Sequence, residues 1–420
     1  MSKTPLLENL RVIEIGDLGE IAGKLLADAG ADVIRVEPPS GATSRHIGPY
    51  PDDKPGLETS LRFTHHNTSK RGITLELTHA EGLDLWWQLV DGADVVIDAA
   101  GHSVLDHLEA GWESRLARSG PTPSVWCSIT PFGREGPWAE WIANDLVQLA
   151  LGGPMMSTGY SDHELPPIRG GFDHSLWMSG EYAMVGILGA LLGLEGSIIP
   201  GPELVDLSIH DAVSCTTEGA FPNWEYRRQL VQRATGRHSA VVPTPEIQFP
   251  TADGRHMNII GSGMPRDTRN LDGLLDWLDK HDATEDLRDP KYREAISAPR
   301  TAAQEERLHF AQVIERFISR LTAEEAYRGG QELHLPWGIV RRPEENLDDP
   351  HWADRGAFAK IELANGRTAR VPTAPYHFKD VSRELQRRAP LLGEHNYAIY
   401  VEELGFTAEE LPRLAEQGAI

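Results

Sequence analysis

The sequence has very little cysteine and no excess of positive charge. Its 420 residues include two cysteines, Cys127 and Cys215, which are far apart and form no CxxC pair. This cysteine usage argues against a disulfide framework and a structural zinc site, and a reducing compartment fits. The formal net charge of −23 argues against a nucleic-acid or anionic-membrane partner, because both require a basic face. An anionic small molecule remains compatible if a local basic pocket or backbone N–H groups hold it.

Long hydrophobic runs and targeting signals are also missing. The longest apolar run, Ala183 to Leu194, is shorter than the ~20 residues that cross a bilayer, so we predict a buried helix there. The N-terminal MSKTPLLENLRVIEIG lacks the charged-then-apolar pattern of a signal peptide, and we expect a cytoplasmic protein. The seventeen histidines show no HExxH spacing, and the pairs His65-His66 and His102/His107 have no local third ligand, so we predict no metal site.

Strand-like and helical segments alternate through the first 130 residues. Short β-branched runs at 10–16, 32–37, 72–77, 93–97 and 124–129 are separated by stretches with helical spacing. This alternation predicts an α/β fold with a Rossmann-like parallel sheet. A further strand is expected at 203–209, a helix at 211–233, and a smaller domain from about residue 251 to 321.

The first strand-to-helix turn invites a dinucleotide interpretation, which we reject. It reads Gly16-x-x-Gly19-x-x-x-Gly23, whereas the dinucleotide fingerprint is G-x-G-x-x-G. Asp17 and Glu20 are also expected to place negative charge where a pyrophosphate would bind.

Asp173 is the most informative single residue. It follows two glycines in PPIRGGFDHS (166–175) and opens a long apolar helix. One interpretation is a helix N-cap, a frequent role of aspartate. The other is a nucleophile that attacks a thioester, with helix N–H groups stabilising the developing charge and the glycines allowing close approach.

An ordered set of segments resembles the class III CoA-transferases, the superfamily of formyl-CoA:oxalate and carnitine CoA-transferases and of α-methylacyl-CoA racemase. The segments include LADAGADVIRVEPPSG (26–41), NTSKRGITLEL (67–77), FGREGPW (132–138), NDLVQLALGGPMMSTG (144–159) and APLLGEHN (389–396). The resemblance implies that Asp173 is the nucleophile and that the protein is an interlocked homodimer. It also implies an α/β large domain built from both chain ends. We therefore divide the chain into an N-terminal part of the large domain (1–215), a linker (216–250), a small α+β domain (251–325) and a return segment (326–420).

The same resemblance implies where coenzyme A binds. The expected positions are Asp17, Leu18, Leu75, Thr78, Ala99, Ala100, Gly101, His107, Asn144 and Asp145. The family's Asn-Phe-x-Pro-Gly turn is replaced by the residues 99–103, and its following arginine by His107, which weakens phosphate pairing. Lys70, Arg71 or Arg45 are candidates to compensate, although a solvated charged face would explain them equally well.

The predicted activity is transfer of CoA from an acyl-CoA thioester to a small carboxylic acid. The resemblance implies an aspartyl mixed anhydride followed by an aspartyl-CoA thioester, with no ATP and no permanently bound cofactor. One alternative is an acyl-CoA racemase or isomerase that uses Asp173 and Asp145. The racemase branch has a histidine where Asn144 stands, and asparagine is no proton-transferring base near neutral pH. Another alternative is a non-catalytic subunit of a heteromeric transferase. Four apolar residues are expected either to line an acyl-binding site or to pack in the core: Met155, Met156, Trp177 and Trp224.

Overall fold

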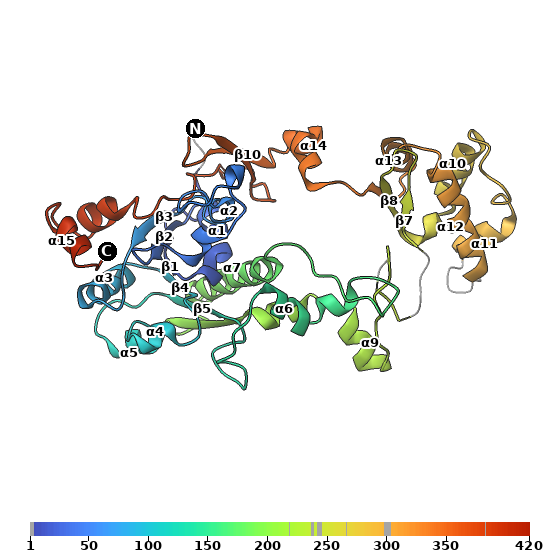
Figure 1. Ribbon diagram of the computed structural model, residues 1–420. Coiled ribbons are helices and arrows are strands. Elements are labelled where there is room, and N and C mark those ends of the chain that lie inside the picture. The colour runs from blue at the N-terminus through green and yellow to red at the C-terminus, as the bar shows by residue number, and fades with distance from the viewer. Residues whose placement is uncertain are drawn as a thin grey trace. The chain divides into compact units, whose positions relative to one another are not determined.

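The chain forms two compact units (Figure 1), which are described separately. The computed structural model describes residues 4–217, 219–236, 239–241, 246–265, 267–297, 304–382 and 384–420. Unit 1 comprises Met1–Pro154, Gly170–Thr216 and Leu347–Ile420, and unit 2 comprises Met155–Arg169 and Thr217–Asn346. Unit 1 is therefore built from both ends of the chain.

A six-stranded sheet forms the centre of unit 1. Its strands are β1 (Arg11–Ile15), β2 (Asp32–Glu37), β3 (Arg71–Thr74), β4 (Val95–Asp98), β5 (Val125–Thr130) and β6 (Glu203–Ser208). They lie in the order β3-β2-β1-β4-β5-β6, and every neighbouring pair is parallel. This is the strand order of the Rossmann fold, so the predicted α/β fold with a Rossmann-like sheet is confirmed. The order reverses between β1 and β4, which opens a crevice at the carboxyl ends of these two strands.

Side chains on β1 and β2 alternate between two very different environments, as strand geometry requires. Ile13 and Ile34 belong to an apolar cluster that includes α3 (Ala80–Asp91) and the C-terminal residues 399–420. Glu14 and Arg35, one position further along each strand, are fully buried and bond to each other instead. One face of the sheet is thus an ordinary apolar core, and the other holds buried charge.

Helices connect the strands of unit 1 and end the chain. Their bounds are α1 (Glu20–Asp28), α2 (Leu61–His66), α4 (Val104–His107), α5 (Trp112–Ala117), α6 (Asp145–Leu151), α7 (His174–Glu195), α8 (Ile209–Cys215), α14 (Pro350–Asp354), the π-helix Tyr397–Glu403 and α15 (Glu410–Glu416). A two-stranded antiparallel hairpin, β10 (Phe358–Glu362) with β11 (Thr368–Pro372), lies in the C-terminal segment. That segment is tied to the edge strand β3, where the Tyr400 hydroxyl donates to the Thr74 carbonyl at 2.7 Å.

Unit 2 combines helices with a small antiparallel sheet. Its elements are α9 (Ala220–Arg227), β7 (Gln248–Pro250), β8 (His256–Ile259), α10 (Thr268–Asp279), α11 (Pro290–Ser297), α12 (Gln304–Ile318), α13 (Ala323–Glu332) and β9 (Trp337–Ile339). The sheet order is β7-β8-β9. Its core packs Met257 and Trp337 from the sheet against Leu274 and Phe317 from the helices.

The observed boundaries differ from the expected ones in several places. Met155–Arg169, expected in the large domain, belongs to unit 2. The expected return segment began at residue 326, yet α13 and β9 belong to unit 2 because β9 pairs with β8, and unit 1 resumes at Leu347. The expected helix over 211–233 is divided into α8 and α9, and the intervening Glu218 lies outside the described residues. Part of the expected linker 216–250 is accordingly helix α9 and strand β7.

Helix α7 is apolar on both faces, but only one face is buried in the single chain. Small residues such as Gly180 and Ala183 face the protein, whereas Tyr182, Val185 and Leu192 are exposed in the single chain. By length and composition alone, α7 would be apolar enough to cross a membrane, but core helices of soluble proteins satisfy the same criterion. The expectation of a buried helix is therefore wrong for its outer face.

The contact between α7 and α1 predicts opposite effects for the same substitution at two glycines. A Cβ at Gly180 would lie 2.6 Å from the Ile21 Cβ and 3.0 Å from the Ala22 nitrogen, whereas a Cβ at Gly189 meets nothing within 4 Å. We expect Gly180→Ala to lower the free energy of unfolding by about 1–3 kcal/mol through overpacking. In the single chain, Gly189→Ala should raise it by up to about 1 kcal/mol through helix propensity. Urea unfolding of both variants checks this, and equal effects would contradict the proposed packing.

Candidate active site

A cavity of about 420 Å³ lies at the carboxyl ends of β1, β2 and β3 and extends to Ala100 after β4, beside the place where the strand order reverses. Asp17 lines it from the turn after β1, Leu75 from the end of β3 and Ala100 from the segment after β4. Gly16 is required at this point, because a Cβ there would lie 2.1 Å from the Ala99 carbonyl. The sheet topology thus brings together residues that are far apart in sequence at a place where α/β proteins usually bind ligands.

The remaining residues predicted for CoA binding are distributed around this cavity and beyond it. Leu18, Ala99 and Gly101 are the sequence neighbours of Asp17 and Ala100. Thr78 and His107 are exposed and do not line the cavity. Asn144 and Asp145 begin helix α6, where the Asn144 side chain accepts a hydrogen bond from the Val147 N–H at 3.0 Å.

The three basic residues considered for phosphate binding already have carboxylate partners. Lys70 contacts Glu14 at 2.8 Å. Arg71 donates to Asp32 at 2.8 Å. Arg45 donates through Nε and Nη2 to both oxygens of Glu37, at 2.6 and 2.8 Å. A solvated charged face is therefore the wrong description of Lys70 and Arg45, which are fully buried. None of the three presents a free charge to a phosphate.

A buried network of ion pairs connects the cavity with helix α1. Arg35 contacts Glu14 at 2.6 Å, Asp17 at 2.6 Å and Glu20 at 3.1 Å. Burial alone would raise the pKa of Glu20, but Arg35, His66 and Arg62 hold it below its usual value. Glu20 thus faces the protein interior, and the expectation that it would repel a bound pyrophosphate is wrong. Gly23 makes room for this network, since a Cβ there would lie 1.5 Å from the Glu14 Oε2 atom.

Asp173 lies at the start of α7, with one oxygen held and the other open. Its Oδ2 accepts a hydrogen bond from the Arg62 Nε at 2.6 Å, and Arg62 Nη1 also reaches Glu20 at 3.4 Å. Within the described chain, no hydrogen bond engages Asp173 Oδ1. The side chain is 26% exposed. A carboxylate that is oriented through one oxygen and accessible through the other has the arrangement required of a nucleophile.

Capping of α7 is carried out by a different carboxylate. Asp173 occupies the N-cap position but makes no side-chain capping hydrogen bond. Asp145 instead accepts hydrogen bonds from the Ser175 N–H at 2.8 Å and from the Ser175 hydroxyl at 2.9 Å. The two interpretations that the sequence left open for Asp173 are thereby separated, because the capping role belongs to Asp145.

Two other groups that could act as nucleophile or base, Cys127 and His65, have unsuitable environments. Burial raises the pKa of Cys127 to about 12, with Asp98 and Asp206 adding to the effect, so its sulfur remains a thiol. Burial, together with Lys24 and His66, lowers the pKa of His65 to about 3, so its imidazole is neutral near pH 7. Within the described ranges, no three metal-ligating side chains gather into a cation site.

Sequence reasoning did not identify Arg62. Nothing in LRFTHH (61–66) marks it, because its contact with Asp173 joins residues 111 positions apart. Of the suggested apolar residues, Trp177 lies one helical turn after Asp173 and packs on His65 with ring centroids 5.7 Å apart. Met155, Met156 and Trp224 belong to unit 2.

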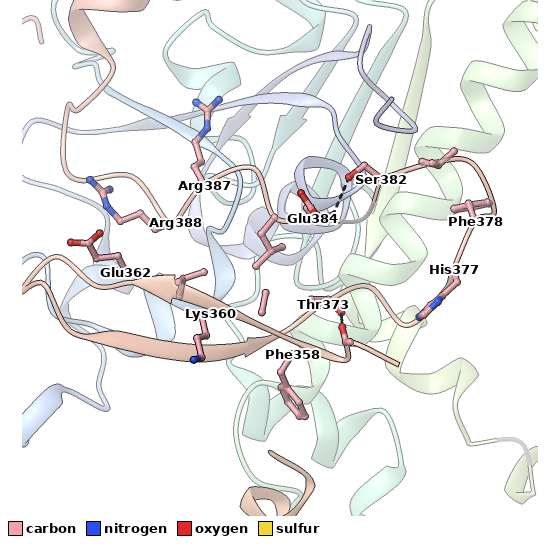
Figure 2. Close-up of a pocket in the computed structure, with 15 residues that line it drawn as sticks. Phe358, Lys360, Glu362, Thr373, His377, Phe378, Ser382, Glu384, Arg387 and Arg388 are labelled. Carbon is pink, nitrogen blue, oxygen red and sulfur yellow. Dashed lines mark hydrogen bonds between the residues drawn. The ribbon is translucent and has the colours of Figure 1, made fainter. Parts of the chain in front are cut away.

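A larger cavity, of about 790 Å³, lies beside the β10–β11 hairpin and contains none of the predicted site residues. Figure 2 shows that the side chains of Lys360 and Arg387 point away from each other. Arg388 is bonded to both oxygens of Glu394, at 2.7 Å each. The basic groups of this cavity therefore do not converge on one anion, and the crevice beside β1 and β4 is the better candidate for the active site.

The fold and the site define an α/β protein with a ligand crevice at the reversal of a Rossmann sheet and an oriented carboxylate at a neighbouring helix start. The sequence profile of CoA-transferase family III matches residues 7–396, and the chain belongs to this family. It is 30% identical to the succinyl-CoA:(R)-benzylsuccinate CoA-transferase subunit BbsE of Thauera aromatica. The alignment covers 98% of this chain and 97% of that protein.

Further relatives have names in the same class. The succinate–glutarate CoA-transferase of Agrobacterium fabrum is 28% identical, with 96% of each chain covered. The formyl-CoA:oxalate CoA-transferase of Streptomyces avermitilis is 28% identical over 99% of this chain and all of that protein. A crystal structure of a CaiB/BaiF family protein from Brucella suis superposes with a TM-score of 0.76 at 25% identity, covering 96% of this chain and all of that one. The sequence-based assignment to the class III CoA-transferases is confirmed.

The division of roles between Asp145 and Asp173 predicts a ranking of stabilities. Asp145→Ala removes the acceptor for the α7 N-terminus and should lower the free energy of unfolding by about 1–2 kcal/mol, the usual cost of a lost N-cap. Asp173→Ala breaks a partly exposed ion pair and should cost less than about 1 kcal/mol. Urea unfolding of both variants provides the comparison. The opposite ranking would return the capping role to Asp173.

Proposed function

We propose that this protein transfers CoA from an acyl-CoA to a carboxylic acid, with Asp173 as the covalent nucleophile. The observation that carries the proposal is the environment of Asp173, whose Oδ2 is held by Arg62 while Oδ1 is open. The helix start behind it is already satisfied by Asp145. A carboxylate at the positive end of a helix that makes no capping hydrogen bond is suited to attack a carbonyl carbon.

The proposed chemistry needs no proton transfer and no ATP. Asp173 Oδ1 attacks the thioester carbonyl, the C–S bond breaks, and the electron pair leaves with the CoA thiolate. The thiolate then attacks the Asp173 carbonyl of the mixed anhydride, forming an aspartyl-CoA thioester and releasing the donor acid as a carboxylate. An acceptor carboxylate enters, and the same two steps run in reverse. Dividing one exchange into these steps is the advantage of covalent catalysis.

CoA is proposed to enter through the crevice beside β1 and β4. Asp17, Leu75 and Ala100 line that crevice, and the ion pairs from Arg35 through Glu20 to Arg62 connect it with Asp173. Backbone groups would supply most contacts, because Arg35 is already surrounded by carboxylates. The other CoA positions expected from the sequence stay predictions: Leu18, Thr78, Ala99, Gly101, His107, Asn144 and Asp145.

The relatives suggest a first substrate pair to test. Two of them carry succinyl-CoA or succinate in their names, combined with benzylsuccinate or glutarate. We therefore propose succinyl-CoA as donor and a dicarboxylic acid as acceptor. The racemase alternative is less well supported, since Asp145, its second acid–base group, is engaged in capping α7.

Covalent trapping tests the nucleophile directly. We expect mass spectrometry of the protein incubated with succinyl-CoA and quenched with hydroxylamine to place the modification on Asp173. Asp173→Ala should reduce transfer at least about 10³-fold, since loss of a covalent nucleophile removes the whole pathway. Deuterium exchange at the α-carbon without an acceptor would instead indicate a racemase. CoA binding without any adduct would indicate a non-catalytic subunit.

The assembly is a separate proposal. Tyr182, Val185 and Leu192 form an exposed apolar strip on α7 in the single chain, and such strips usually mark interfaces. We propose that a second copy of the chain covers it in an interlocked homodimer. Light scattering should give twice the chain mass, and Val185→Asp should reduce it. A monomer that associates only with another gene product would support a heteromeric enzyme, as the word subunit in the name of the Thauera relative suggests.

A further inference from the structure

Arg62 holds Asp173 with only part of its hydrogen-bonding capacity. Its Nε donates to Asp173 Oδ2 at 2.6 Å and its Nη1 reaches Glu20 Oε2 at 3.4 Å. Within the described residues, Nη2 has no hydrogen-bond partner. Nε and Nη2 form one edge of the guanidinium fork, which matches the two oxygens of a carboxylate. When Asp173 is unmodified, only the Nε atom of that edge therefore has a hydrogen-bond partner.

The positive charge of Arg62 has no dedicated partner other than Asp173. Glu20 is shared, since it also contacts Arg35 at 3.1 Å, Asn67 at 3.2 Å and His66 at 3.3 Å. The Arg62 side chain is 11% exposed. A guanidinium this well buried favours an anion at its Nε, because charge-assisted hydrogen bonds are shorter and stronger than neutral ones. When Asp173 becomes an anhydride or a thioester it loses its charge, and Arg62 keeps only the longer, shared contact.

The proposed reaction supplies a replacement anion at that moment. The reacting groups carry one negative charge throughout, first on Asp173, then on the thiolate sulfur, then on the released or incoming carboxylate. While Asp173 is bound to CoA, the mobile anion is therefore the carboxylate of the acid substrate. This carboxylate must also lie beside the Asp173 carbonyl that it attacks, and therefore beside Arg62.

We infer that Arg62 is the carboxylate-binding residue of the acid substrate, and that it exchanges Asp173 for this carboxylate during each turnover. The inference rests on the proposed function. Arg62 would then recognise the carboxylic acid substrate, while the crevice beside β1 and β4 would bind CoA. Asp173 in its free form competes with the acid for Arg62, which keeps the acid out until the enzyme is acylated.

A binding experiment tests this without catalysis. Asp173→Asn imitates the uncharged, covalently modified side chain, so we expect it to bind succinate at least about 10-fold more tightly than the unmodified protein in calorimetry. Adding Arg62→Gln to Asp173→Asn should abolish that gain. Adding Arg328→Gln should leave it unchanged, because Arg328 forms only an exposed pair with Glu324 on α13. Equal succinate binding with and without Arg62, or no binding by either protein, would overturn the inference.

Kinetics separate this inference from the proposed function. With Asp173 intact, Arg62→Gln should raise the KM for the acid at least about 10-fold and change the KM for succinyl-CoA less than about 3-fold. Arg62→Lys should fall between, because it keeps the charge but loses the fork. If the unmodified protein forms no adduct on Asp173, the proposed function fails. If the adduct forms but Arg62→Gln leaves the KM for the acid unchanged, only the role of Arg62 fails.

Discussion

The site depends on the ion pairs that Arg35 makes beneath helix α1. Arg35 and Glu14 are fully buried on a face of the sheet where apolar side chains would normally pack, and they meet at 2.6 Å. Such pairs add little net stability, because the desolvation of each charge offsets the attraction between them. Their consequence here is geometric. They fix Asp17 at the crevice and Glu20 at the start of α1, and Glu20 in turn contacts the arginine that holds Asp173.

Two aspartates at the start of α7 have separate roles because they come from different parts of the fold. Asp145 enters from helix α6 and satisfies the N–H of Ser175, whereas Asp173 belongs to α7 itself and points its Oδ2 at Arg62. Because Asp145 supplies the cap, covalent modification of Asp173 would leave the hydrogen bond from the Ser175 N–H in place. Supplying the cap from another helix leaves Asp173 free for the covalent chemistry proposed for it.

The Rossmann strand order does not by itself imply dinucleotide chemistry. The glycines of the first turn, which resemble a phosphate-binding sequence, have packing functions in this protein. Gly16 allows β1 to approach the Ala99 carbonyl, and Gly23 provides space for the carboxylate of Glu14. Family membership and the site, rather than the fold, therefore carry the functional conclusion.

The sequence by itself determined the parallel α/β architecture, the family and the position of Asp173, because these depend on local periodicity and on segments that are continuous in the chain. The tertiary structure alone decided that Lys70 and Arg45 are buried partners of carboxylates, that Asp145 caps α7 and that Arg62 holds Asp173. The oppositely charged partners in these ion pairs are separated by 8 to 111 positions in the sequence. Sequence spacing determines which residues share a face of one helix or strand, but pairing between elements is set by how they pack, and local pattern does not record it.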